Sequence, residues 1–142
     1  MVERAMPLPI LNKATIDCLA RHQVQALYVF GSRAQGTDHP LSDYDYAILL
    51  PETGHFRGDD LYTIFYDALS SISPRTLKND VIDIVFLREA GLELKFHVIR
   101  YGVVLYDPVP RERLRFEDHT TLLYCDYRPV LDQFDRAILE RI

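Results

Sequence analysis

The sequence predicts an α/β fold in which a small sheet is flanked by helices and followed by a C-terminal helical tail. Two observations carry this prediction. Short apolar runs typical of buried strands alternate along the chain with segments whose apolar residues recur at helical spacing. Near the C-terminus, apolar residues recur at every fourth position, at Val130, Phe134, Ile138 and Ile142, and this spacing favours one face of a helix.

The length and composition favour one soluble globular domain. The chain has 142 residues, of which 48% are hydrophobic and 26% are charged, as is ordinary for a folded domain with its own core. We expect a single domain over residues 1–142, with a core at about residues 12–106 and a helical extension at about residues 111–142.

The first half of the chain is predicted to hold a helix and two strands. Ile16 and Leu19 recur at helical spacing behind Asn12, a residue type that favours helix N-caps. One apolar run then ends at Gly31 and a second is stopped by Pro51, as expected of buried strands between loops. The expected elements are a helix at 12–23, a strand at 24–30, a loop at 31–42 and a strand at 45–50.

The second half is predicted to continue this alternation and to end in a helix. Leu61, Phe65 and Leu69 share one helical face behind Asp59 or Asp60, either of which is a suitable N-cap. Pro129 is expected to start or to kink the last helix. The expected elements are a loop at 52–60, a helix to about 71, a strand at 81–87, a helix around 90–100, a strand at 103–105 and a helical tail beyond Pro110.

Net charge, cysteine spacing and the length of the apolar runs argue against extended nucleic-acid binding, a zinc or disulfide site, and a membrane span. The formal net charge is −5, whereas proteins that grip long nucleic acids usually carry a basic excess. Cys18 and Cys125 lie far apart, without the spacing of a zinc site or a disulfide framework. No signal peptide is visible and no apolar run approaches the ~20 residues that cross a bilayer. We therefore expect a cytoplasmic protein that binds neither a membrane nor extended nucleic acid.

Two short motifs between the first two strands point to nucleotide chemistry. Glycine lets backbone N–H groups approach phosphate oxygens closely and serine adds a hydroxyl donor, so Gly31 and Ser32 are predicted to hold a triphosphate. Arg33 is a candidate for neutralising the leaving pyrophosphate, and Ser42 is assigned to the nucleotide-binding set as the residue that orients the turn before the acidic pair. The motifs are Gly31-Ser32-Arg33-Ala34-Gln35-Gly36 and Ser42-Asp43-Tyr44-Asp45.

Three aspartates are predicted to be catalytic metal ligands. Asp43 and Asp45 lie two residues apart, so they share one face of a strand, and Tyr44 between them faces the other way. Asp83 lies alone among aliphatic residues of the third strand, where an unpaired buried charge would be costly; the alternative is an exposed acid on an edge strand. If the second and third strands are neighbours, the carboxylates converge, and two Mg²⁺ ions would relieve their repulsion. Two such ions stabilise both oxygens of an in-line displacement at phosphorus.

The motifs together resemble the minimal nucleotidyltransferases of the DNA polymerase β superfamily, and more narrowly the MntA-type antitoxins of HEPN/MNT toxin–antitoxin pairs. The segments that carry the resemblance are GSRAQG, LSDYDYAILL, VIDIVFL and IRYGVVLY. The resemblance implies a polymerase-β-like fold with a small mixed sheet, ATP as cosubstrate with two Mg²⁺ ions, and AMP transfer to a protein. The acceptor it implies is a tyrosine hydroxyl of a cognate HEPN RNase toxin, which is thereby neutralised.

Two other functions are compatible with the same residues. An antitoxin could inhibit its toxin by binding alone, and a small-molecule nucleotidyltransferase of the aminoglycoside-modifying kind would share the triphosphate motif. The loop at 52–60 and the tail at 111–142 are candidate partner surfaces, although the apolar stripe of the tail is expected rather to cover the sheet.

Overall fold

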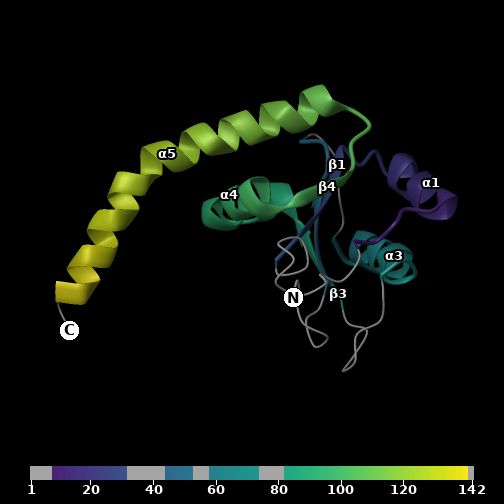
Figure 1. The fold of residues 1–142 in the computed structure, drawn as a ribbon, viewed down its shortest axis with the longest axis horizontal. Helices are drawn as coiled ribbons and strands as arrows, with labels where there is room; N and C mark the ends of the chain where they lie inside the picture. The colour runs from purple at the N-terminus through teal and green to yellow at the C-terminus, as the bar shows by residue number, and fades with distance from the viewer. Residues whose placement is uncertain (1–7, 32–43, 53–57, 74–81, 141–142) are drawn as a thin grey trace, which may run out of the picture.

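The fold of the chain is an α/β arrangement, as the sequence predicts. The structure is a computed structural model that describes residues 8–31, 44–52, 58–73 and 82–140. Within these ranges, four strands form one sheet, and helices cover both of its faces (Figure 1). The elements are α1 (Lys13–Arg21), β1 (Ala26–Phe30), β2 (Tyr44–Leu49), α3 (Gly58–Ser70), β3 (Ile82–Phe86), a 3-10 turn η1 (Leu87–Glu89), α4 (Leu92–Tyr101), β4 (Val103–Tyr106) and α5 (Pro110–Glu140).

The sheet is mixed, as the family resemblance implied. Its strand order is β3-β2-β1-β4. The strand β1 runs antiparallel to both β2 and β4, whereas β2 and β3 run parallel to each other. The C-terminal end of β1 therefore meets the N-terminal ends of β2 and β3 at one end of the sheet.

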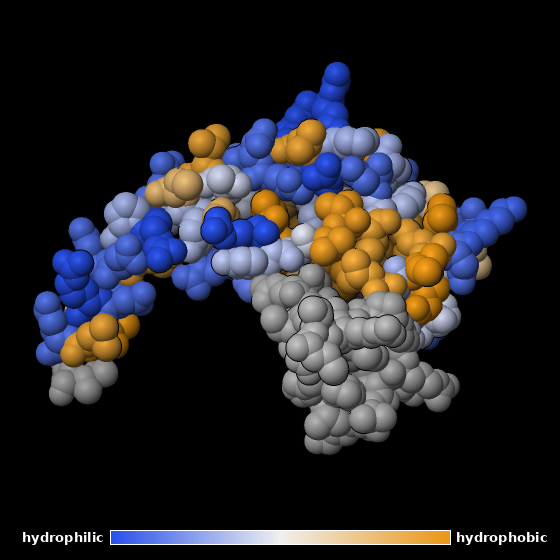
Figure 2. Space-filling model, viewed as in Figure 1, coloured by the Kyte–Doolittle hydropathy of each residue, from blue (hydrophilic) through white to orange (hydrophobic). Residues whose placement is uncertain are grey.

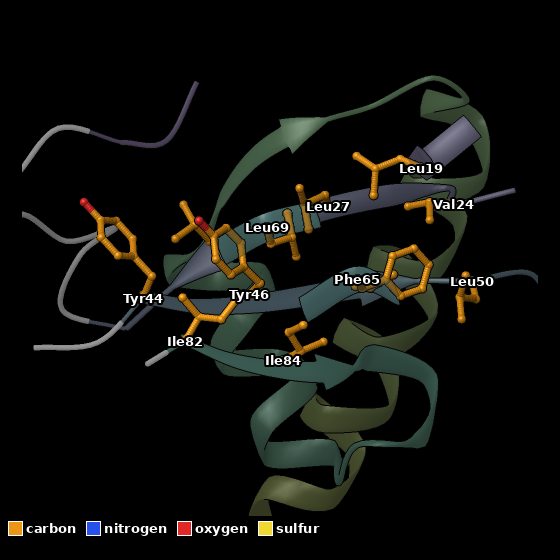
Figure 3. Close-up of a cluster of buried hydrophobic side chains, with 12 residues drawn as sticks. Leu19, Val24, Leu27, Tyr44, Tyr46, Leu50, Phe65, Leu69, Ile82 and Ile84 are labelled. Atoms are coloured by element: carbon orange, nitrogen blue, oxygen red, sulfur yellow. The ribbon is translucent and has the colours of Figure 1, made fainter. Parts of the chain in front are cut away.

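One face of the sheet packs against α1 and α3. Side chains alternate between the two faces of a strand, so Tyr44, Tyr46 and Ile48 of β2 all point to this face. Tyr44 is buried, as predicted for the residue between the two acids. Figure 3 shows this cluster, which includes Leu19, Val24, Leu27, Tyr44, Tyr46, Phe65, Leu69, Ile82 and Ile84.

The other face of the sheet packs against α4 and α5. Tyr28 of β1 and Ala47 of β2 are buried there against Val98 of α4 and Phe116 of α5. Figure 1 shows α4 and α5 on the side of the sheet opposite α1 and α3. This second face is also the one to which Asp45 and Asp83 belong, since each is one residue away from the buried tyrosines and isoleucines of the first face.

The ends of α1 show why predicted and observed boundaries differ by a few residues. Asn12 caps the helix as predicted, because its side-chain Oδ1 accepts a hydrogen bond of 2.8 Å from the N–H of Thr15. The helix ends at Arg21 rather than at residue 23. Gln23 adopts a left-handed backbone with φ of 59°, and the N–H of Val24 donates to the carbonyl of Leu19. This hydrogen bond and the left-handed residue before it are typical of a Schellman C-cap, which stops a helix locally.

The helix of the tail begins about where the sequence predicts, whereas its apolar stripe does not cover the sheet as expected. The helix α5 begins at Pro110, a position where the missing N–H of proline costs nothing, and it continues through Pro129 to Glu140. Figure 1 shows that α5 extends past α4 and bends toward its C-terminal end, as expected of a helix with an internal proline.

The expectation that the stripe of the tail covers the sheet is wrong for the described residues. Val130, Phe134 and Ile138 are 44%, 64% and 58% exposed, and Ile142 lies outside the described residues. The reason is length, because the buried residues of α5 are Phe116 and Thr120 and the helix has left the sheet before the stripe begins.

A partly buried polar network holds the first half of α5 on the sheet. The Tyr28 hydroxyl donates a hydrogen bond of 2.8 Å to Glu117 Oε2, and Arg113 Nη1 donates one of 2.9 Å to the same oxygen. Arg113 Nε also lies 3.0 Å from Asp107 Oδ1, just before the helix. Strand β1, the segment after β4 and α5 are thus joined through Arg113 and Glu117.

Within the part of the chain that the structure describes, no helix combines the length and the apolar character that crossing a bilayer requires.

The hydrogen bond of Tyr28 generates a pH-dependent prediction. Burial, followed by the hydrogen bond and charge of Glu117, raises the pKa of Tyr28, so folding favours its neutral phenol. That stabilisation is present below the unfolded-state pKa of about 10 and is lost as the pH rises above it. We expect Tyr28→Phe to lower the free energy of unfolding by about 1 kcal/mol at neutral pH, and the difference from wild type to shrink above pH ~10.

Urea unfolding at a series of pH values measures this difference. Tyr62→Phe is the control, because Tyr62 is exposed on α3 and its loss of a hydroxyl should change little at any pH. A Tyr28→Phe difference that stays constant from neutral to alkaline pH would contradict the role given to the phenol.

Candidate active site

Gly31 directly follows β1, at the end of the sheet where the predicted site lies. Its φ is +79°, in the left-handed region that glycine adopts without strain and other residues rarely adopt. The residue before it, Phe30, pairs with Asp45 across the antiparallel β1–β2 ladder. The chain therefore turns away from the sheet directly beside an acidic residue.

Asp45 and Asp83 are brought together by the parallel pairing of β2 and β3. The two residues are register partners, and register partners in a parallel pair project from the same face of the sheet. Their neighbours Tyr44 and Ile82 are also partners and are buried on the opposite face. The sequence predicts that the carboxylates converge if the second and third strands are neighbours. The strands are neighbours, and Asp45 and Asp83 do lie together.

Asp83 is not buried among the aliphatic residues of its strand, although the sequence pattern predicts that it would be. The residue is exposed, and β3 is an edge strand of the described sheet. The cost of burying an unpaired charge is therefore not what demands a ligand here, and the alternative of an exposed edge-strand acid describes its position correctly. An exposed carboxylate beside the half-buried Asp45 remains accessible to an ion or a substrate from solvent.

Gly31 and Asp45 are in close contact. A Cβ atom added at Gly31 would lie 2.6 Å from Asp45 Oδ2, inside any tolerated contact distance. The absence of a side chain at this position therefore leaves room for the carboxylate. The first residue of the predicted phosphate motif and one predicted metal ligand occupy adjoining space.

Four of the predicted site residues lie outside the described residues: Ser32, Arg33, Ser42 and Asp43. Among the residues that are described, no group of three His, Cys, Asp or Glu side chains is placed to hold a metal ion. Asp45 and Asp83 supply carboxylate oxygens, the donors that Mg²⁺ prefers, and Mg²⁺ is commonly held by one or two carboxylates together with substrate phosphates. The donor chemistry of this pair fits the implied ion.

Helix α4 also borders this end of the sheet, which the sequence reasoning did not foresee. The His97 ring lies 6.4 Å from the ring of Phe30 in an edge-on arrangement, measured between centroids. His97 also lies 5.1 Å from the ring of Tyr101, one helical turn later. Phe30 is the register partner of Asp45, so His97 is a candidate site residue. The only signal in the sequence was its four-residue spacing from Tyr101.

A cleft of about 610 Å³ lies between α4 and α5 and includes His97. Phe96 of α4 stacks on Tyr124 of α5 with 3.9 Å between ring centroids. Arg128 donates a hydrogen bond of 2.7 Å to the Tyr124 hydroxyl, and this bond is the main cause that raises the pKa of Arg128. The cleft combines guanidinium groups, at Arg100 and Arg128, with aromatic rings, which suits an anionic or aromatic group of an incoming molecule.

The positive φ of Gly31 predicts that Gly31→Ala is destabilising. The substitution imposes a left-handed backbone on a residue with a Cβ, so we expect the free energy of unfolding to fall by about 1–2 kcal/mol, while the Asp45 carboxylate rotates away from the new Cβ. Gly91→Ala is the matched control, since an added Cβ there meets no atom within 4 Å. Gly91 also has a negative φ of −66°. Urea unfolding of both variants checks this, and equal losses would contradict the backbone strain assigned to Gly31.

Comparison with protein families identifies the chain's relatives. A model of the polymerase beta nucleotidyltransferase family matches residues 13–110. No curated protein sequence matches the chain.

The solved structures that the chain resembles include toxin–antitoxin complexes. One is a crystal structure of a toxin–antitoxin with AMP-PNP, which is 27% identical, with a TM-score of 0.60 over 87% of this chain and 98% of that one. An MntA–HepT toxin–antitoxin is 20% identical, with a TM-score of 0.56 over 85% and 93% of the two chains. A complex of tri-AMPylated Shewanella oneidensis HEPN toxin with MNT antitoxin is 21% identical, with a TM-score of 0.56 over 85% and 92%. At their lower identity, the last two establish a likeness of fold.

The family match spans all four described strands and the helices from α1 to α4. It therefore contains the whole framework that places Gly31 beside Asp45 and Asp45 beside Asp83. The resemblance drawn from the sequence motifs is confirmed, and the chain belongs to the polymerase β family of nucleotidyltransferases.

Proposed function

We propose that this chain is an antitoxin that transfers AMP from ATP to a tyrosine hydroxyl of a cognate HEPN RNase toxin and thereby neutralises it. The observation that carries the proposal is the meeting of Gly31, Asp45 and Asp83 at one end of the sheet. Membership of the nucleotidyltransferase family supports the reaction type. The likeness to a toxin–antitoxin bound to AMP-PNP, and to a complex with an AMPylated HEPN toxin, supports the cosubstrate and the acceptor.

The proposed reaction is a displacement at the α-phosphorus of ATP. A bond forms between the acceptor tyrosine oxygen and the α-phosphorus. The bond from that phosphorus to the oxygen bridging the α- and β-phosphates breaks, and pyrophosphate leaves with the electron pair. The phenol proton passes to a carboxylate at the site, for which Asp83 is suited because it is exposed on the edge strand and reachable by an acceptor from solvent.

The phosphate motif is proposed to hold and orient the triphosphate. Backbone N–H groups at Gly31 and Ser32 and the Ser32 hydroxyl donate to phosphate oxygens, while Arg33 offsets charge on the leaving pyrophosphate. Ser42 orients the turn that presents the acidic pair. The bare Cα of Gly31 leaves space beside the Asp45 carboxylate, so phosphate oxygens held by the motif would lie near a proposed metal ligand.

The three aspartates, Asp43, Asp45 and Asp83, are proposed to hold two Mg²⁺ ions. When bound, these ions stabilise the negative charge on the attacking and leaving oxygens. Asp45 and Asp83 project from one face of adjacent strands, so both carboxylates are directed at the same volume at the sheet's end. A cytoplasmic location fits this proposal and stays a prediction.

Charge-neutral substitutions of the aspartates test the proposal. We expect Asp45→Asn, Asp83→Asn and the double variant Asp43→Asn/Asp45→Asn each to lower AMP transfer by at least about 100-fold, because the charge that holds the metal is lost. Asp17→Asn is the matched control, since Asp17 lies exposed on α1, on the far face of the sheet. Intact-mass spectrometry of the HEPN protein after incubation with ATP and Mg²⁺ measures the transfer.

The same experiment separates the proposal from its alternatives. A mass increase of one or more AMP units, absent with the aspartate variants, supports protein adenylylation. A stable complex without any mass increase would assign inhibition to binding alone. Neither complex nor mass increase would direct attention to small-molecule acceptors, which a panel of aminoglycosides with ATP would then test.

A further inference from the structure

The second half of α5 carries a row of apolar residues that the rest of the described chain leaves uncovered. Leu123, Tyr127, Val130, Phe134 and Ile138 are spaced three or four residues apart, so they share one face of the helix. We call this row the α5 stripe. Every one of its five members is exposed, and Figure 2 shows apolar residues along the part of α5 that projects from the body.

The helical state of this segment is informative by itself. The described part of α5 is one helix of 31 residues, yet its buried residues are confined to its first half, at Phe116 and Thr120. Helical segments without tertiary packing are marginal in water, and a row of exposed large apolar side chains marks an interaction surface. The stripe is therefore suited to being covered by another structural element.

The stripe continues into a groove on the body. A second cleft, of about 590 Å³, is lined by Leu92 and Leu94 of α4 together with Tyr127 and Leu131 of α5. Its walls are mostly apolar side chains from two helices. A groove between two helices, extended by an apolar row on one of them, has the form that receives the apolar face of a further helix.

The charges beside the stripe favour a basic partner over a second copy of this chain. Asp126, Gln133 and Glu140 are seven residues apart and flank one side of the stripe, as g positions flank a coiled-coil seam. Antiparallel pairing of two copies would set Asp126 of one against Glu140 of the other, and parallel pairing would set Asp126 against the apolar Leu131. A helix with Lys or Arg beside its apolar face meets the same acids with opposite charge.

We propose that the α5 stripe is the docking surface for an amphipathic helix of the partner toxin, whose apolar face covers the stripe and whose Lys or Arg residues lie against Asp126 and Glu140. The identity of that partner rests on the proposed function. The surface lies on α5 from Leu123 onward, beyond the buried Phe116 and Thr120 that pack on the body, so docking and AMP transfer use different residues.

Matched substitutions on the two sides of α5 test the docking surface. We expect Phe134→Asp to weaken binding of the purified HEPN protein by at least about 30-fold in titration calorimetry, since it replaces a large apolar side chain of the stripe with a charge. Leu139→Asp is the control: Leu139 is 70% exposed on the same segment but lies off the stripe, and its affinity should stay within about threefold of wild type. Circular dichroism of both variants establishes that the helix is retained.

A charge reversal tests the partner's chemistry. Asp126→Lys/Glu140→Lys is expected to weaken binding of the HEPN protein, and wild-type binding is expected to weaken with rising salt. Light scattering of the chain alone should show a monomer. A dimer that Phe134→Asp dissociates would assign the stripe to a second copy and overturn the partner helix.

The readouts keep this inference separate from the proposed function. Asp45→Asn should bind the HEPN protein as tightly as wild type while transferring far less AMP. Equal affinities of Phe134→Asp and Leu139→Asp, or no binding of the HEPN protein by wild type, overturn the docking surface whatever the mass spectrum shows. Binding that depends on Phe134 without any AMP transfer supports the docking surface and contradicts the transferase.

Discussion

The register between β1, β2 and β3 is the constraint on which the candidate site depends. Phe30, Asp45 and Asp83 are aligned across three strands. Because side chains alternate with a period of two, a slip of β2 or β3 by one residue would turn its aspartate toward α1 and α3 and its buried neighbours toward the opposite face. The register is held by burial of Tyr44, Tyr46 and Ile82 on the opposite face. The apolar core of one face thus sets the geometry of the carboxylates on the other.

Two glycines allow close approaches near the aligned residues Phe30, Asp45 and Asp83. Gly31 leaves room for Asp45 at the end of β1, as its added Cβ would overlap the carboxylate. A Cβ added at Gly102 would lie 2.4 Å from the carbonyl oxygen of Val98 and 3.4 Å from that of Val29. The missing side chain lets α4 pass directly into β4 beside β1, which brings His97 against Phe30. The placement of α4 at the site therefore follows from a close backbone approach.

Helix α5 is divided between two roles by the position of its anchor. Tyr28, Glu117 and Arg113 join its first turns to the centre of the sheet, and the Phe96–Tyr124 stack joins its middle to α4. Beyond that stack the helix projects from the body (Figure 1). The first half of α5 packs on the sheet and completes the core. The projecting half is free of the core and is available to a partner.

Sequence alone determined the elements and predicted a chemistry for the motifs, because both predictions rest on neighbouring residues. Apolar runs placed each strand to within about two residues, and the spacing of Asp43 and Asp45 indicated a shared face before any strand order was known. The tertiary structure decided what depends on distant residues: that β3 lies beside β2, that Asp83 is exposed on an edge, and that His97 borders the site. It also decided that Val130, Phe134 and Ile138 of α5 lie beyond the sheet. Periodicity shows which side of a helix is apolar, but what covers that side depends on where long-range packing directs the helix.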